Sequence, residues 1–278
     1  MPTVRIVTDS TSDISPGVVA RLGITVVPAY IQVGGNSYQD GAGLRREELY
    51  ARMSEMEDPP TTSVPPAQGF ASAYRDLARE ADEIVAIVVS STLSGMQNVA
   101  ELGASEVPDV KVHVIDSLQV SMGIGWMVIA AAKAAAEGRT AQEIVQVVED
   151  LKARVHTYAA LDTVHFLRLG GRTTWPRARA ADMLGIKPVL EVFRGKVTLV
   201  HQARTRKQAI DRLVEIVGEA GQPERLAIIH TLAPEVHEFR ERLAIHCPRE
   251  DLFTAVATTI IGAHVGPRAL GVALVSNQ

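Results

Sequence analysis

Short apolar runs alternate with polar segments and helical stretches through the first half of the chain. Val4–Val7, Ile84–Val89 and Lys111–Ile115 have strand character, and each run ends in hydroxyl and carboxylate side chains. Helical patterns at 67–81, from 96 onward, at 123–137 and at 140–154 lie between or after them. Because strand, polar loop and helix alternate at least three times, the pattern predicts a Rossmann-like α/β/α domain with a parallel sheet over residues 1–155.

The second half has a different pattern, with more strands and fewer helices. Its runs of strand character are Tyr158–Leu161, Val189–Phe193, Lys196–His201, Leu226–Ile229, Leu252–Val256 and Gly271–Ser276. Helical patterns cover 205–218 and 234–243, and Arg194-Gly195 is a two-residue hairpin signal between two runs. Residues 156–278 are therefore predicted to form an α+β domain on a mixed sheet. The expected fold class is α/β with two domains.

Composition narrows the class of protein. The chain has 278 residues, 46% hydrophobic and 22% charged, which excludes a disordered or collagen-like polymer. Its single cysteine, Cys247, cannot form an internal disulfide. The first residues lack the pattern of a signal peptide, and the apolar stretch Met122–Ala132 is too short to span a bilayer. A soluble cytoplasmic protein is expected.

The net charge of −4 conceals an asymmetry between the halves. Residues 1–150 carry 10 Lys and Arg against 20 Asp and Glu, whereas residues 151–278 carry 18 against 12. The basic residues gather between Arg168 and Lys207. A local field of this sign favours an anionic ligand or partner, although a solvated basic face would give the same count.

Several familiar catalytic patterns are absent from the sequence. It contains no phosphate-binding loop, no H-E-x-x-H, no G-x-S-x-G and no G-x-G-x-x-G after the first strand. The eight histidines show no metal-ligand spacing. With 4% aromatic residues, the chain also offers few stacking platforms for nucleic acid. A metalloenzyme, a dinucleotide enzyme and a nucleic-acid-binding protein are therefore not expected.

Hydroxyl-rich segments follow or lie near the strands of the predicted parallel sheet. They are Thr8–Asp13, Thr61–Ser63, Ser90–Ser94 and Asp116-Ser117. In open α/β sheets the ligand crevice lies outside the carboxyl ends of the strands. Helices beginning after Ser63 and Ser94 would point free N–H groups into that crevice, which suits an anion. Taken singly, each segment also fits an ordinary helix cap or turn.

Two glycine-containing clusters in the second half carry basic side chains. Arg168-Leu-Gly-Gly-Arg172 is followed by Lys187 and Arg204, and arginine gives planar, bidentate recognition of phosphate or carboxylate. Glycines surround His264 in the run 262–271, which suggests a tight loop that presents the imidazole. A histidine buried for structural reasons is the alternative.

Taken together, these segments resemble the DegV family, whose members are fatty-acid-binding subunits of bacterial fatty acid kinase. The matching pieces are Thr8-Asp-Ser-Thr-Ser-Asp13, Thr62-Ser63 before Pro65, Ser90-Ser-Thr-Leu-Ser-Gly95, Asp116-Ser117, Leu169-Gly-Gly-Arg172 and Gly262-Ala-His264-Val-Gly-Pro267. No piece is specific alone, but their order is, and the resemblance covers essentially the whole chain.

The resemblance implies one long-chain fatty acid, such as palmitate, in a buried tunnel between the two domains. It implies that Thr62, Ser63, Ser94 and Gly95 bind the carboxylate. It places Arg172, Arg204 and His264 at the mouth, in support of phosphoryl transfer. No metal, cofactor or catalytic residue of the chain's own is implied.

The resemblance also implies a partner. A kinase subunit similar to dihydroxyacetone kinases would hold ATP and phosphorylate the bound acid to an acyl phosphate, which feeds phospholipid synthesis. The chain itself would be a carrier, with transient membrane contact to collect its ligand.

Two departures and two other functions remain open. Many family members have glycine where this chain has Arg268, and the run Arg172-Thr-Thr-Trp175 also differs from the family pattern. The histidine among glycines would also fit an autonomous transferase or hydrolase with His264 as general base. A regulatory module that senses lipid would use the same pocket.

Overall fold

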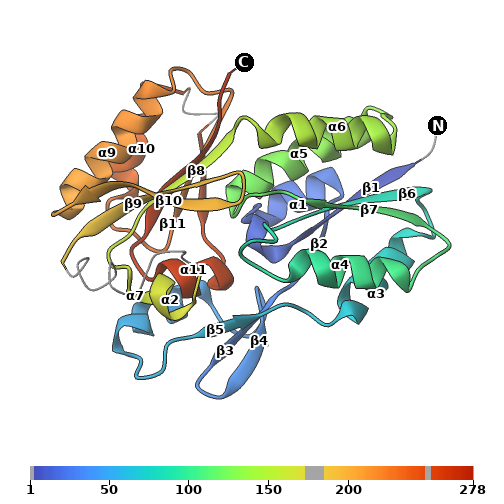
Figure 1. Cartoon of the computed structure of the whole chain (residues 1–278), viewed down its shortest axis with the longest axis horizontal. Helices are drawn as coiled ribbons and strands as arrows, with labels where there is room; N and C mark the ends of the chain where they lie inside the picture. Colours follow the sequence, from blue (N-terminus) through green and yellow to red (C-terminus); the bar gives the residue numbers. More distant parts are fainter. Residues whose placement is uncertain (1–2, 173–184, 248–251, 278) are drawn as a thin grey trace.

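The structure, a computed structural model, describes residues 3–172, 185–247 and 252–277 (Figure 1). It contains two large sheets and one small sheet. The N-terminal sheet is formed by β1 (Val4–Asp9), β2 (Thr25–Val27), β6 (Glu83–Val88) and β7 (Lys111–Asp116). Its strands lie in the order β2-β1-β6-β7 and are all parallel, which confirms the predicted sheet.

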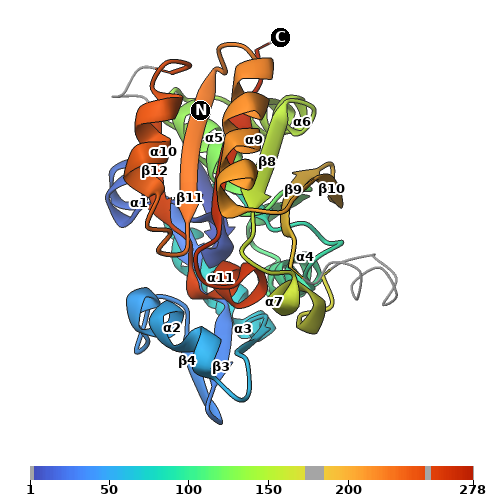
Figure 2. The ribbon, with the colours of Figure 1, turned by 90° about the vertical axis from the view of Figure 1, so that its left-hand side faces the viewer.

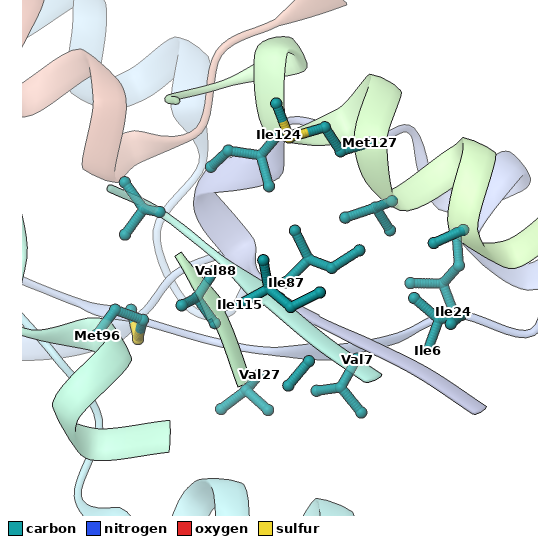
Figure 3. Close-up of a cluster of buried hydrophobic side chains, with 14 of the residues drawn as sticks. Ile6, Val7, Ile24, Val27, Ile87, Val88, Met96, Ile115, Ile124 and Met127 are labelled. Carbon is teal, nitrogen blue, oxygen red and sulfur yellow. The ribbon is translucent and has the colours of Figure 1, made fainter. Parts of the chain in front are cut away.

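Helices cover both faces of the N-terminal sheet (Figure 1). On one face are α1 (Pro16–Leu22), α5 (Met122–Ala136) and α6 (Ala141–Lys152). On the other are α3 (Ala67–Leu77) and α4 (Met96–Ser105). The central strands are consequently buried on both sides, and residues 84–88 have no exposed surface. Figure 3 shows Ile87 and Ile115 of the sheet beside Ile124 and Met127 of α5.

The C-terminal sheet has six strands in the order β10-β9-β8-β13-β11-β12. They are β8 (Val155–Ala160), β9 (Lys187–Phe193), β10 (Lys196–Ala203), β11 (Arg225–His230), β12 (Leu252–Val256) and β13 (Leu270–Val275). Only the pair β11–β12 is parallel, so the sheet is mixed as predicted. Two helices, α9 (Arg206–Glu219) and α10 (Val236–Leu243), pack on its outer face through Leu213, Val217 and Phe239.

The small sheet was not expected from the sequence. It has the order β4-β3-β5, with β3 (Tyr30–Val33), β4 (Asn36–Gln39) and β5 (Thr61–Ser63) all antiparallel. The segment Thr61–Ser63, which alone would fit a turn, is a strand in which Thr62 pairs with Ile31. Two prolines on each side leave only residues 61–64 between them, which is why the strand is so short.

The remaining elements are short. They are α2 (Arg46–Arg52), α7 (His165–Leu169), α11 (Thr259–Val265) and the 3-10 turns η1 (Ser10–Ser12) and η2 (Met53–Glu55). Figure 2 shows α11 between the C-terminal sheet and the part of the chain that contains α2 and β3. This helix, near the end of the chain, packs against α2, β3, β5 and α7.

Buried side chains from both large sheets belong to one continuous hydrophobic core. Ile87 and Trp126 of the first half share it with Ala227 and Ala273 of the second. The Trp126 Nε1 donates a hydrogen bond of 3.0 Å to the Ala273 carbonyl, which links the first half of the chain to the C-terminal sheet. The predicted division at 155/156 falls at the first residues of β8, and it stays a prediction because this core is continuous across it.

Arg268 has a backbone conformation that glycine adopts at lower cost. Its φ is 62°, in the left-handed region that penalises any residue with a Cβ atom. The Arg268 N–H donates to the Thr231 carbonyl at 2.7 Å, which fixes this turn before β13. Its guanidinium is half exposed and lies 3.8 Å from a Glu235 carboxylate oxygen.

Replacing Arg268 by glycine should therefore stabilise the fold. We expect Arg268→Gly to raise the free energy of unfolding by about 0.5–1 kcal/mol, measured by chemical denaturation, because the left-handed strain disappears. Arg268→Ala is the matched control. It removes the same long, exposed ion pair but keeps the strain, and should change stability by less than about 0.5 kcal/mol. A glycine variant no more stable than the alanine variant would contradict this account.

Candidate functional site

A cavity of about 190 Å³ lies between the two large sheets. This is more than ten times the roughly 10–15 Å³ needed to hold one water. Most of its wall is aliphatic, including Val89, Met96, Leu190, Ile229, Ile260 and Val265. Among the described residues that line it there is one arginine and no acidic side chain. The cavity is therefore suited to a mainly apolar ligand.

Six of the seven predicted site residues line this cavity. Thr62 and Ser63 come from β5, Ser94 and Gly95 precede α4, and Arg172 and His264 come from the second half of the chain. Arg204 is not brought to the site. It follows β10, the edge strand of the C-terminal sheet, its side chain is exposed, and it does not line the cavity.

Thr62 and His264 lie at the centre of the polar residues that line the cavity. The Thr62 Oγ1 and the His264 Nε2 are 3.0 Å apart, although 202 residues separate them in the sequence. The other ring nitrogen, Nδ1, is buried and has no hydrogen-bond partner. It faces Gly170 so closely that a Cβ atom there would lie 2.4 Å from it.

This packing favours one proton arrangement. A bare acceptor lone pair against the Gly170 backbone costs less than a buried N–H without an acceptor, so Nδ1 is the unprotonated nitrogen. Nε2 then donates to the Thr62 oxygen, and the Thr62 hydroxyl proton is free to point into the cavity. The pair thus presents a neutral donor to a ligand.

His264 is neutral at physiological pH. Burial, together with the nearby Arg172 guanidinium, lowers its pKa to about 4. A base this weak, with an Nδ1 that no carboxylate or carbonyl orients, is poorly suited to general-base catalysis. The geometry therefore does not favour the reading of the site as a hydrolase.

Ser94 and Gly95 supply donors at the first turn of α4. The Ser94 Oγ accepts a hydrogen bond of 3.3 Å from the Met96 N–H, which leaves its own proton available. Gly95 is the N-cap residue, and a Cβ atom built there would meet no atom within 4 Å. A ligand oxygen can therefore approach the backbone of this turn directly, where the helix dipole favours a negative charge.

Arg172 is fixed beside this turn by backbone carbonyls. Its Nε donates to the Leu93 carbonyl at 3.2 Å and its Nη1 to the Gly170 carbonyl at 2.5 Å. The side chain is partly exposed, so one edge of the guanidinium stays open at the mouth. The rest of the run Arg172-Thr-Thr-Trp175 lies outside the described residues.

The family model described as "Uncharacterised protein, DegV family" matches residues 3–277 of the chain. The chain belongs to the DegV family. A DegV domain-containing protein of Streptomyces coelicolor is 35% identical over 278 residues, which is 98% of each chain. One from Deinococcus radiodurans is 36% identical over 280 residues, again 98% of each chain.

Solved structures of DegV proteins have the same fold. One, described as showing fatty acid binding by a DegV family protein from Thermus thermophilus, is 31% identical, with a TM-score of 0.91 and full coverage of both chains. Another, described as DegV, a fatty acid binding protein from Bacillus subtilis, is 26% identical, with a TM-score of 0.89 and full coverage of both chains.

Five further hydroxyls line the described wall of this DegV cavity, and all but Thr11 were missed from the sequence: Thr11, Ser121, Thr157, Tyr158 and Thr231. Each donates its proton away from the cavity. Thr11 donates to Asp9 at 2.5 Å, Thr157 to the Gln119 side chain at 2.9 Å, and Ser121 to Asp13. No local sequence signal marks Thr157, since its partner lies 38 residues away.

Two properties hold for the part of the DegV chain that the structure describes. In that part, no three His, Cys, Asp or Glu side chains come together in a way that could hold a metal ion. Nor is any described helix both long and apolar enough to cross a membrane.

The pKa of His264 predicts a pH dependence of stability. The folded value of about 4 lies below the ordinary value near 6.5, so the folded state binds fewer protons between these pH values. The wild-type protein therefore loses stability from this group as the pH falls from 6.5 to 4. His264→Gln should not, and its stability relative to wild type should rise by up to about 3 kcal/mol over that window.

Denaturation curves of both proteins at several pH values test this. Buried carboxyls such as Asp9 and Asp13 titrate in both proteins and cancel in the difference. A difference that stays constant between pH 4 and 6.5 would mean that His264 is not held in its neutral form.

Proposed function

We propose that this protein binds one long-chain fatty acid in the cavity between its two large sheets. The observation that carries the proposal is an apolar cavity in which the free proton donors gather at Thr62, Ser94 and Gly95. The Ser63 Oγ accepts a hydrogen bond of 2.9 Å from the Gln32 amide, so its proton is available as well. The other hydroxyls in the described wall donate to the protein. The fatty-acid binding described for the Thermus thermophilus and Bacillus subtilis relatives supports this assignment.

The apolar wall would supply most of the affinity. Each buried CH₂ group contributes about 0.8 kcal/mol, so a 16-carbon acid such as palmitate gains on the order of 12 kcal/mol before ordering costs. The carboxylate then needs only hydrogen-bond donors for its oxygens. Neutral donors do this at lower desolvation cost than a buried arginine pair would.

We further infer that the protein is a carrier that presents the carboxylate to a partner kinase of the dihydroxyacetone-kinase type. The partner would supply ATP and metal, and the acyl phosphate would feed phospholipid synthesis. Arg172 supports this inference, since its guanidinium lies at the mouth next to the head-group donors. An acyl phosphate carries more negative charge than the acid, so a cation there stabilises the product more than the substrate.

Denaturing extraction followed by mass spectrometry tests the ligand. The wild-type protein, incubated with palmitate and washed, should release a stoichiometric long-chain fatty acid. The double variant Thr62→Ala/Ser94→Ala should retain at least tenfold less, because two carboxylate donors are lost while the apolar wall remains.

Thr61→Ala/Ser91→Ala is the matched control. Both residues are exposed neighbours that do not line the cavity, and their hydroxyls bond to Gln32 and Asp116. This control should retain palmitate like the wild type. Wild-type protein that takes up no fatty acid would overturn the proposed function, and full retention in the Thr62/Ser94 variant would overturn the carboxylate assignment.

A second test separates transfer from binding. Arg172→Ala should bind palmitate within about threefold of the wild type but form acyl phosphate with the kinase at least tenfold more slowly. Arg168→Ala, an exposed arginine one turn earlier, is the control and should behave like the wild type. Arg204→Ala, assayed alongside, decides whether that exposed residue takes part. Wild-type transfer rates in Arg172→Ala would remove this residue from the reaction.

A further inference from the structure

The helix that carries His264 is anchored by residues from the opposite end of the sequence. Two buried aspartates of the first half hold the start of α11. The Asp13 Oδ1 accepts a hydrogen bond of 2.7 Å from the Thr258 N–H. The Asp40 Oδ1 accepts two bonds from Thr259, at 3.2 Å from its N–H and at 2.7 Å from its hydroxyl.

A tyrosine of α2 fixes the same end of α11 and its middle. The Tyr50 hydroxyl lies 2.7 Å from the carbonyl oxygens of both Ala257 and Thr258. Its ring packs against Gly262, where an added Cβ atom would lie 2.1 Å from a ring carbon. Only glycine allows this approach. The contact therefore fixes both the position of α11 along its axis and its rotation about that axis.

Arg46, at the start of α2, completes the set. Its Nη1 donates to the Val256 carbonyl at 2.6 Å, just before the α11 turn. Four side chains of the first half thus hold residues 256–259. In the sequence, however, α11 lies between β12 and β13, which are both strands of the C-terminal sheet.

The far end of α11 carries the head-group site. A seven-residue helix spans only about 10 Å, so a shift or rotation at Thr259 is passed on to His264 nearly undiminished. The His264 ring has little room to move with the helix, since it lies between Thr62 on one side and the Gly170 backbone on the other.

We propose that Asp40, Asp13 and Tyr50 are positioning residues of the carboxylate site, because they fix the start of α11 and thereby hold His264 against Thr62. The proposal rests on the function proposed above. It adds residues that do not contact the ligand but set the geometry of a group that does.

The cost of these carboxylates argues for a positional role. Asp13 is fully buried, and loss of hydration raises its pKa to about 6. One oxygen of Asp40, Oδ2, is buried with no partner in the described structure. Apolar residues of similar size would hold two surfaces together at lower cost, but they would not define the direction of the helix as hydrogen bonds do.

Asp40→Ala and Asp40→Asn, compared in the full-length protein, test the proposal. Asparagine keeps an acceptor oxygen for Thr259, and alanine does not. Two quantities are measured: the Kd for palmitate, and the pKa of the His264 ring from NMR titration, with its signal assigned by comparison with His264→Gln. Thr140→Ala is the matched control, because it removes a side-chain helix cap of the same kind from α6, away from the cavity.

Asp40→Ala should raise the Kd about tenfold and move the His264 pKa up toward 6.5. Asp40→Asn should stay within about threefold of the wild type, and Thr140→Ala should move neither quantity even if it lowers the melting temperature as much. Tyr50→Phe keeps the ring but loses both hydroxyl contacts, and should shift both quantities in the same direction by less. It keeps the test open if Asp40→Ala fails to fold.

A variant of Asp40 or Tyr50 that is less stable but has an unchanged His264 titration and an unchanged Kd would overturn the proposal. Failure of the proposed function would give a different result from failure of this proposal. In that case the wild-type protein binds no palmitate, while the His264 titration still shows whether Asp40 and Tyr50 position the ring.

Discussion

An apolar space kept between two sheets is the constraint on which the rest of the structure depends. Across about 190 Å³ of mainly apolar space, the side chains of the two sheets do not pack directly against one another, so contacts around the cavity have to hold the sheets together. Hydrogen bonds around the cavity make this connection. The Gln119 amide donates to carbonyls of Val155 and Val192, and Thr92 and Leu118 bond to the backbone of Gly195 at the tip of the β9–β10 hairpin.

The same constraint explains the distribution of charge. An acidic side chain in the wall would repel a carboxylate, and the described wall contains none. The buried carboxylates Asp9, Asp13 and Asp40 lie behind it, where they accept hydrogen bonds from wall hydroxyls or hold the start of α11. The hydroxyls of Thr11 and Ser121 therefore donate away from the cavity.

The sequence predicted what depends on local pattern. Continuous apolar runs such as Ile84–Val89 correctly indicated strands of the parallel sheet. Three of the four hydroxyl-rich segments, all but Asp116-Ser117, contribute side chains to the cavity. It could not predict which distant segments meet. Thr62 contacts His264 although 202 residues separate them in the sequence. The strand β5 has only three residues, too few to show a periodic pattern. Arg204 was expected at the mouth because of the family resemblance, yet it follows an edge strand, is exposed and does not line the cavity.

Trp126 provides the molecule with an optical reporter. Its indole is buried between the two large sheets, donates to Ala273 of β13 and lies edge-on to Phe253 of β12, with 5.9 Å between ring centroids. Any separation of α5 from the C-terminal sheet exposes this ring to water and shifts its emission to longer wavelength. The sequence has one other tryptophan, Trp175, so a Trp175→Phe background would let fluorescence follow the opening and closing of the two sheets in real time, without an added label.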